Sequence, residues 1–288
     1  MSNVSLVDLK RLSKETSAGL VHCKKALAES GGDYDKAREI LKEFGHAVSV
    51  KKSNREASDG VVGALSSGNF GVMIELNCET DFVARNDKFQ QFADLVLQAV
   101  CENKAKTVEE CLAVTLSGGQ TVRDAIMEQI SIFRENIVLS KCTAFELSGS
   151  GLVGVYIHNK YTENLGKIGV VVALESNAAA LQDVAKNIAI QIMSECPQAI
   201  SIQDIDPELL SGEKEKYREE TQGKPDSVAE KIVQGKLNKF YKRIVLLEQP
   251  LFADPEISVK QYLDNVAAEL SGVIKVLWYR VFTLGDAD

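Results

Sequence analysis

Two stretches of this chain, far apart in the sequence, follow the same plan of strand, turn, strand and helix. In the first, apolar residues alternate along two strands around a turn at Ser66–Asn69, which is the pattern of a β-hairpin with a buried face. The strands and helix are expected at 60–65, 70–78 and from about Asn86 in the first copy, and at 151–157, 169–174 and 181–192 in the second. This duplication predicts an α+β core of two related subdomains, each an antiparallel sheet covered by helices on one face.

The residues before this core predict a separate helical module. Apolar residues recur at helical spacing through 1–46, and breaks at 16–19 and 31–33 divide them into three short helices, the last ending at Gly45. Such a three-helix module resembles ubiquitin-associated domains, which bind other proteins and catalyse no reaction. Residues 47–59 have little apolar content and are expected to form a linker.

The core is expected to be interrupted by a projecting helical hairpin. Residues 60–147 form the first predicted subdomain, and residues 148–196 with 227–288 form the second. Residues 197–226, which separate the two segments of the second subdomain, are strongly charged. Together with a helix at 227–241 they predict a hairpin that stands out from the core and is a candidate dimerisation element. The remaining elements of the second subdomain are predicted as strands at 244–247 and 273–282 and a helix at 259–270.

The composition limits the classes of function. A formal net charge of −8 argues against direct binding to nucleic acid, which needs a basic face. The six cysteines include no Cys-x-x-Cys pair and do not cluster with the three histidines, so we expect reduced thiols and neither a metal site nor a cofactor. The amino terminus lacks the pattern of a signal peptide, and no apolar run approaches the roughly 18 residues that span a bilayer. We therefore expect a cytoplasmic protein without membrane contact.

Only one pair of neighbours invites a catalytic interpretation. His22 and Cys23 are adjacent, as a base and a nucleophile would need to be in space. On a helix, however, adjacent side chains point about 100° apart, so the two do not readily share a hydrogen bond. A structural role is favoured, and a cysteine-dependent hydrolase lacks its paired base.

The segment Asn77–Asn86 places an aromatic residue between a strand and a helix. Phe82 follows the strand predicted at 70–78 and precedes the helix that starts near Asn86, and its neighbours are mostly polar or charged. Two interpretations remain open from the residues alone. Phe82 folds back to cap the core, since most Phe side chains are buried, or it stays exposed as an anchor for a partner protein.

The same segment resembles the signature of the bacterial elongation factor Ts family, which reads Asn-x-x-Thr-Asp-Phe-Val-Ala and is matched in full at 77–84. Stretches within 16–27 and 230–250 are also similar to this family, so the resemblance runs nearly from end to end. It implies the α+β fold described above. It also implies a guanine nucleotide exchange factor, not an enzyme, that binds elongation factor Tu, disturbs its Mg²⁺/phosphate site and promotes GDP release during translation elongation.

The resemblance further implies which residues contact elongation factor Tu. These predicted partner-binding residues are Thr80, Asp81, Phe82, Val83, Lys24, His158 and Phe252. Phe82 is expected to insert into a cleft of the partner's nucleotide-binding domain, with Asp81 in polar contact beside it. From the residues alone, a structural interpretation is as good as partner contact for three of them: Lys24 as a solvated helix lysine, His158 as a turn histidine and Phe252 as a core aromatic residue.

The chain departs from the family pattern in two places. Phe133-Arg134-Glu135-Asn136-Ile137 stands where the family often has Ile-Gly-Glu-Asn-Ile, so a contact near the partner's phosphate region is expected to change or move. The sequence also ends at Asp288 without the extra helical module of some relatives, so part of the usual interface is expected to be absent.

The alternative function is an adaptor or chaperone-like scaffold that binds through the three-helix module and has no exchange activity. The sequence leaves the oligomeric state open, with a homodimer or a 2:2 complex with the partner as candidates.

Overall fold

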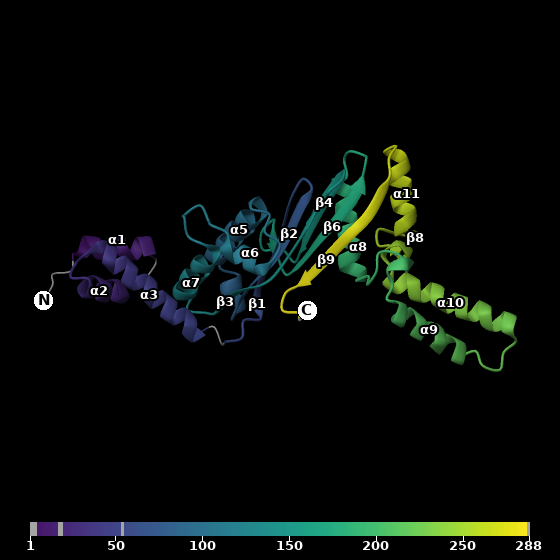
Figure 1. Ribbon diagram of the computed structural model, residues 1–288, viewed down its shortest axis with the longest axis horizontal. Helices are drawn as coiled ribbons and strands as arrows, with labels where there is room; N and C mark the ends of the chain where they lie inside the picture. Colours follow the sequence, from purple (N-terminus) through teal and green to yellow (C-terminus); the bar gives the residue numbers. More distant parts are fainter. Residues whose placement is uncertain (1–4, 17–19, 53–54, 287–288) are drawn as a thin grey trace.

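The computed structural model describes residues 5–16, 20–52 and 55–286 and has an elongated shape. Two main antiparallel sheets lie at its centre, with a helical bundle towards the amino terminus and a helical hairpin at the opposite end (Figure 1). This arrangement confirms the predicted α+β fold with its three-helix module, two sheet-plus-helix units and projecting hairpin. Within the described ranges, no helix has both the length and the apolar character that crossing a membrane requires.

The amino-terminal module encloses a small apolar core of its own. Its helices are α1 (Leu6–Thr16), α2 (Leu20–Glu29) and α3 (Tyr34–Lys52). The core between them is made by Leu12, Cys23, Ala26, Leu27, Ala37 and Leu41. Cys23 is therefore a buried packing residue of this module, as the sequence analysis favoured.

The third helix of this module is longer than predicted. It was expected to end at Gly45 and to be followed by a linker at 47–59, whereas α3 continues to Lys52. A glycine inside a helix costs only about 1 kcal/mol relative to alanine, and α3 lies against α7 (Val122–Phe133) of the neighbouring unit, which favours the continued helix. The predicted turn at 16–19 lies mostly outside the described residues.

The first main sheet has the strand order β3-β2-β1-β5 and is antiparallel. Its strands are β1 (Asp59–Ser67), β2 (Phe70–Cys78), β3 (Ile137–Glu146) and β5 (Leu165–Gly166). Helices α5 (Asp87–Glu102), α6 (Val108–Ala113) and α7 pack on one face. The predicted alternation in β2 is confirmed, because Val72, Ile74 and Leu76 share one apolar cluster with these helices.

The second main sheet has the order β4-β6-β9. Its strands are β4 (Gly151–His158), β6 (Ile168–Ser176) and β9 (Ile274–Thr283), and its helices are α8 (Gln182–Glu195) and α11 (Val259–Glu269). The strand predicted at 244–247 is wrong, because α10 (Asp226–Ile244) runs into this stretch and a 3₁₀ turn, η2 (Leu246–Glu248), follows. Val245 and Leu246 are buried, so the apolar pattern indicated burial correctly but not conformation. A short hairpin of β7 (Pro250–Leu251) and β8 (Asp254–Ser258) comes next.

The backbone shows the duplication down to its irregularities. In each copy the third strand pairs with the second strand of the hairpin, and the register shifts after Glu75 in β2 and after Ala173 in β6. Gly60 and Gly151 stand at the start of the two hairpins with φ angles of 139° and 149°, where a side chain would collide with the opposite strand. These matched features support two related units.

The two sheets pack face to face, so the core has four layers in the order helix, sheet, sheet and helix. The layer between the sheets includes Val62, Met73, Val153, Val171 and Phe282. One ion pair is also enclosed there, with Lys141 Nζ 3.2 Å from Glu75 Oε2. The Gly285 N–H donates to Glu75 Oε1 at 3.0 Å, so this carboxylate fastens the end of β9 to the first sheet.

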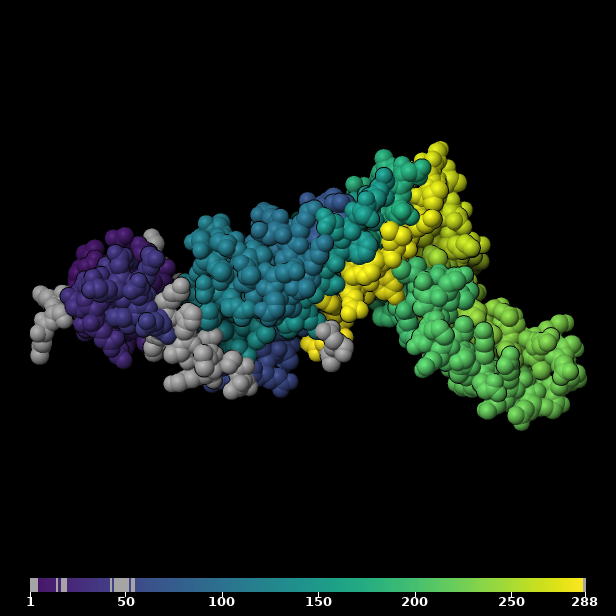
Figure 2. Space-filling model, in the orientation of Figure 1, coloured from purple at the N-terminus to yellow at the C-terminus, as the bar shows by residue number. Residues whose placement is uncertain are grey.

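The projecting hairpin consists of α9 (Pro207–Glu219) and α10, and it stands clear of the body (Figure 2). Its base is fixed by an apolar cluster of Ala199, Ile205, Phe240, Ile244 and Val245. The predicted hairpin range of 197–226 therefore covers mainly the first arm, since α10 forms the whole second arm.

Candidate functional site

Phe82 is the most exposed large apolar residue of the described chain, with 82% of its surface accessible. It lies in α4 (Asp81–Ala84), a single helical turn that follows β2. Thr80 precedes this turn in an extended conformation, and its hydroxyl accepts the Val83 N–H as a helix N-cap. Ala84 is buried, and Val83 packs on the apolar cluster between the first main sheet and its helices. The turn therefore holds Phe82 outward. The interpretation in which Phe82 caps the core is therefore wrong.

Glu135 braces this turn from the segment that follows α7. Its Oε1 accepts the Thr80 hydroxyl at 2.7 Å, and its Oε2 accepts the Thr80 backbone N–H at 3.1 Å. Hydrogen bonds to a carboxylate are stronger than those between neutral groups. The N-cap residue of α4 is thus tied by both of its donors to a segment far away in the sequence.

A second set of polar contacts lies beside the first. Glu79 Oε1 accepts the Asn136 N–H at 2.7 Å, and Glu79 Oε2 lies 3.4 Å from the Arg55 guanidinium. The Asn136 side-chain amide donates to the Arg55 carbonyl at 2.7 Å. Three chain segments therefore meet directly behind the turn that carries Phe82.

The remaining sides of the turn are also fixed. The Cys78 thiol donates to the Thr80 carbonyl at 3.2 Å, and burial raises the pKa of this thiol to about 12. The Gln90 side-chain amide donates to the Ala84 carbonyl at 3.1 Å, which joins α4 to α5. Asn86 caps α5, and the predicted helix start near Asn86 is confirmed. The result is an exposed aromatic ring on a braced base.

The sequence departure at 133–134 leaves this brace in place. Phe133 turns towards the core and meets Phe89 edge-on, with ring centroids 6.0 Å apart. Arg134 ends α7 in the left-handed region, at φ 58° and ψ 28°, a conformation that glycine adopts more easily. Sequence reasoning compared this stretch with the family pattern but missed Glu135 as a bracing residue. Thr80 and Glu135 are far apart in the sequence, and residue spacing cannot predict a hydrogen bond between such distant residues.

Of the other predicted partner-binding residues, Asp81 shares α4 with Phe82, whereas Lys24, His158 and Phe252 lie on separate elements. Asp81 is next to Phe82 and pairs with Arg85 at 3.4 Å on the surface. Lys24 is exposed on α2, and His158 ends β4 with its Nδ1 3.3 Å from the Tyr156 hydroxyl. Phe252 lies between β7 and β8 and is 59% exposed, so it is not a core aromatic. Figure 1 shows α2 and β8 towards opposite ends of the molecule, so the structure does not gather these residues into one site.

Phe252 is also held by buried polar groups. Gln191 and Gln249 are almost fully buried, and the Gln191 amide donates to Gln249 Oε1 at 3.2 Å. Gln191 Oε1 accepts the Phe252 backbone N–H at 2.6 Å, and the Gln249 amide donates to the Glu195 carbonyl at 3.2 Å. Two exposed phenylalanines, each supported by an internal hydrogen-bond network, thus occur in the two halves of the core.

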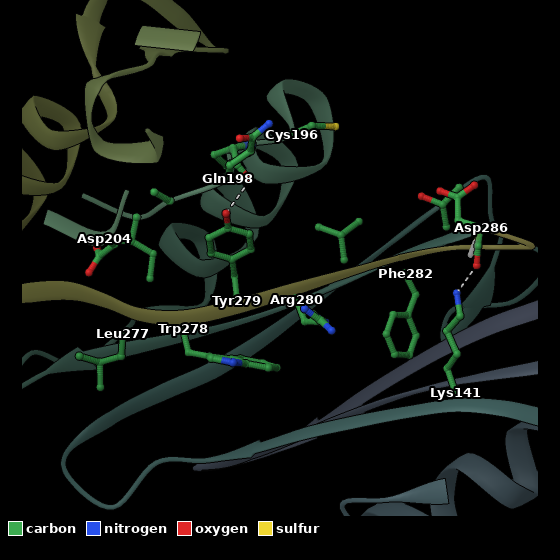
Figure 3. Close-up of a pocket in the computed structure, with 15 residues that line it drawn as sticks. Lys141, Cys196, Gln198, Asp204, Leu277, Trp278, Tyr279, Arg280, Phe282 and Asp286 are labelled. Atoms are coloured by element: carbon green, nitrogen blue, oxygen red, sulfur yellow. Dashed lines mark hydrogen bonds between the residues drawn. The ribbon is translucent and has the colours of Figure 1, made fainter. Parts of the chain in front are cut away.

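Figure 3 shows a hollow lined by β9 and by residues from the segment at 196–204, and Phe82 is not one of its lining residues. The Tyr279 hydroxyl donates to the Pro197 carbonyl at 2.6 Å, and burial raises the pKa of this tyrosine to about 12. Lys141 donates to the Asp286 carbonyl at 2.5 Å. These polar groups hold the carboxyl-terminal strand in place, which is a structural task.

Comparison with known proteins supports the resemblance found in the sequence. Residues 79–286 match the family described as Elongation factor TS. The protein named Elongation factor Ts of Neorickettsia sennetsu (strain ATCC VR-367 / Miyayama) is 68% identical over 290 residues, covering 100% of both chains. Those of Rickettsia massiliae (strain Mtu5) and Ehrlichia canis (strain Jake) are each 38% identical, covering 99% and 98% of this chain and 93% and 99% of their own. With a family match over most of its length and full-length relatives of this identity, the chain belongs to the elongation factor Ts family.

Proposed function

We propose that this protein is a guanine nucleotide exchange factor that binds elongation factor Tu and promotes GDP release during translation elongation. Membership of the elongation factor Ts family supports this role. The observation that carries the mechanism is Phe82, an aromatic ring 82% exposed on a turn that is braced from behind. An exposed aromatic ring on a base that is already held in position is typical of an anchor residue in a protein–protein interface.

The thermodynamic requirement for exchange is simple. The factor binds the nucleotide-free partner more tightly than the nucleotide-bound partner, and by linkage it then weakens nucleotide binding by the same ratio. A GTPase holds its nucleotide through phosphate-cradling amides and a bridging Mg²⁺. We infer that Phe82 enters a cleft beside these elements and displaces groups that support the metal and the phosphates. No bond is broken, so we propose that the protein is not an enzyme in the strict sense.

The hydrogen bonds that fix α4 determine how much of the free energy of burying Phe82 remains as binding affinity. Burying a phenylalanine is worth about 1.5–3 kcal/mol, and about 1.4 kcal/mol corresponds to a factor of ten in affinity. Phe82 therefore supplies roughly one to two powers of ten. A side chain on a loose loop would lose part of this gain in ordering itself, whereas the Thr80–Glu135 contacts hold α4 in position beforehand.

The rest of the interface comes from residues spread along the molecule. We propose that Asp81 makes a polar contact beside Phe82, that Lys24, His158 and Phe252 add contacts from three other elements, and that Thr80 and Val83 act by positioning the turn. The wide spacing of these residues along the molecule suits a large partner that contacts this protein at several separate places. A net charge of −8 supports contact with protein and not with nucleic acid. We place the protein in the cytoplasm with this partner.

The release of labelled GDP from elongation factor Tu tests this function. Catalytic amounts of the full chain should accelerate release in the presence of excess unlabelled GDP, and alkylating the exposed thiols should leave the acceleration intact. An adaptor or chaperone-like scaffold would bind elongation factor Tu without accelerating release. A cysteine-dependent hydrolase would leave GDP release unchanged and would lose its own activity on alkylation. Either result would refute the proposed function.

A further inference from the structure

Two cysteines far apart in the sequence meet within the first subdomain. Cys111 comes from the short helix α6 and Cys142 from the strand β3 on which that helix packs. Their sulfur atoms lie 3.2 Å apart and are joined by a hydrogen bond. A disulfide needs a separation of about 2.05 Å, so the pair would close by about 1 Å to form one. We infer that Cys111 and Cys142 form a reversible intramolecular disulfide on exposure to a peroxide.

The surroundings of the pair give it the features of an oxidation site. Cys111 is buried, whereas Cys142 is partly exposed and provides the route by which a small oxidant arrives. The hydrogen bond with Cys142 lowers the pKa of the Cys111 thiol, and the same contact raises the pKa of Cys142. The thiolate is the reactive form of cysteine, and a neighbouring thiol that can resolve the oxidised sulfur is typical of redox-sensitive sites.

The reaction is balanced with hydrogen peroxide as the oxidant. The Cys111 thiolate attacks one peroxide oxygen, so an S–O bond forms and the O–O bond breaks. The departing hydroxide takes up the proton released by the Cys111 thiol and becomes water. The Cys142 sulfur then attacks the Cys111 sulfur, so the S–S bond forms, the S–O bond breaks and the second hydroxide leaves as water with the Cys142 proton. Two thiols are oxidised and one peroxide is reduced to two waters. A dithiol restores the starting state by thiol–disulfide exchange.

The other cysteines of the subdomain provide an internal comparison. Cys78 donates its thiol proton to the Thr80 carbonyl, and its raised pKa makes it a poor nucleophile. Cys101 is buried on α5 in the same apolar cluster as Cys111, and burial raises the pKa of its thiol. Cys196 is exposed but lies in the second subdomain, where its thiol faces the Met193 carbonyl. Proximity of two thiols, and not exposure alone, therefore distinguishes the Cys111–Cys142 pair.

The experiment uses the full chain with Cys196→Ser, which removes the exposed competing thiol. The protein is treated with hydrogen peroxide under native conditions, its remaining thiols are blocked by alkylation during denaturation, and its peptides are mapped by mass spectrometry. The expected result is one linked peptide pair that contains Cys111 and Cys142. Before alkylation, the intact mass of the treated protein should be lower than that of the untreated protein by two hydrogens. Reduction should abolish both the linked peptide and the mass difference. The matched control, which also carries Cys101→Ser, should form the same link.

Three outcomes would overturn the inference. The first is full alkylation of both Cys111 and Cys142 after peroxide treatment. The second is a link that joins either one to a different cysteine, and the third is conversion of one of them to an irreversible acid without any link. Adding Cys142→Ser should abolish the linked peptide. If that variant fails to fold, the peptide map of the Cys196→Ser protein alone decides the question.

Discussion

The brace behind Phe82 can be tested by replacing Glu135 with alanine. The change removes the acceptor of two hydrogen bonds from Thr80, at 2.7 and 3.1 Å. A hydrogen bond to a charged group contributes about 1.5–3 kcal/mol, but the released Thr80 groups lie close enough to the surface to regain water. We therefore expect the free energy of unfolding to fall by about 1.5–3 kcal/mol in total, measured by denaturant titration.

The same change should also reduce exchange, although Glu135 itself need not touch the partner. Once α4 is released, Phe82 occupies its binding position for only part of the time, and the apparent affinity falls by that fraction. A drop in the occupied fraction to about one tenth would weaken binding about tenfold, seen as slower GDP release at subsaturating concentrations and as recovery at high concentrations.

A matched control and a double-mutant cycle make this prediction sharp. Glu109 is likewise a carboxylate that accepts a hydrogen bond, in its case from the Arg123 guanidinium at 3.0 Å, but its side chain is 80% exposed. Glu109→Ala should therefore change stability by no more than about 1 kcal/mol and leave exchange unchanged. In the cycle, Glu135→Ala should have little further effect on exchange once Phe82→Ala is present. Full additivity of the two changes, or a Glu135→Ala protein as stable and as active as the original, would refute the bracing role.

The remaining predictions concern the rest of the molecule. Lys141→Met leaves the buried Glu75 carboxylate without its cationic partner and should lower the free energy of unfolding by about 3–5 kcal/mol. The exposed pair of Lys275 and Glu175 should contribute less than about 1 kcal/mol. Equal losses of stability in Lys141→Met and Lys275→Met, measured by denaturant titration, would contradict this. In native alkylation at neutral pH, the exposed Cys196 should react and Cys78, with a pKa raised to about 12, should not; mass spectrometry of the labelled peptides decides. Replacing the hairpin tip, 212–232, by a short flexible turn should leave a cooperative unfolding transition because most of the tip is exposed and it stands clear of the body. Loss of the transition would show that the tip belongs to the core.

The sequence predicted those features that follow from local patterns. Alternation in β2 and β6 identified the hairpins, and the apolar spacing that follows Asn86 identified the start of α5. The predicted strand at 244–247 is wrong, because a short apolar run is compatible with either a strand or a buried helix end. The third helix extends past Gly45 because its tertiary contact with α7 outweighs a weak propensity.

The candidate site divides in the same way. Phe82 could be found from its polar neighbours and from the family motif, but its exposure required the structure. The contacts of Glu135 with Thr80 and of Gln191 with Phe252 join residues far apart in the chain, and neither spacing nor composition encodes such pairs. The close approach of Cys111 to Cys142 was equally invisible, because sequence reasoning examined only neighbouring cysteines.

The most direct test of the account is Phe82→Ala, measured both for stability and for GDP release from elongation factor Tu. Because Phe82 is 82% exposed, its truncation should change the free energy of unfolding by no more than about 0.5 kcal/mol, as for surface substitutions in general. GDP release should slow by one to two powers of ten, corresponding to about 1.5–3 kcal/mol of lost insertion energy. A variant that unfolds early, as a truncated core phenylalanine would by about 3–5 kcal/mol, yet exchanges nucleotide normally while folded, would contradict the central claim.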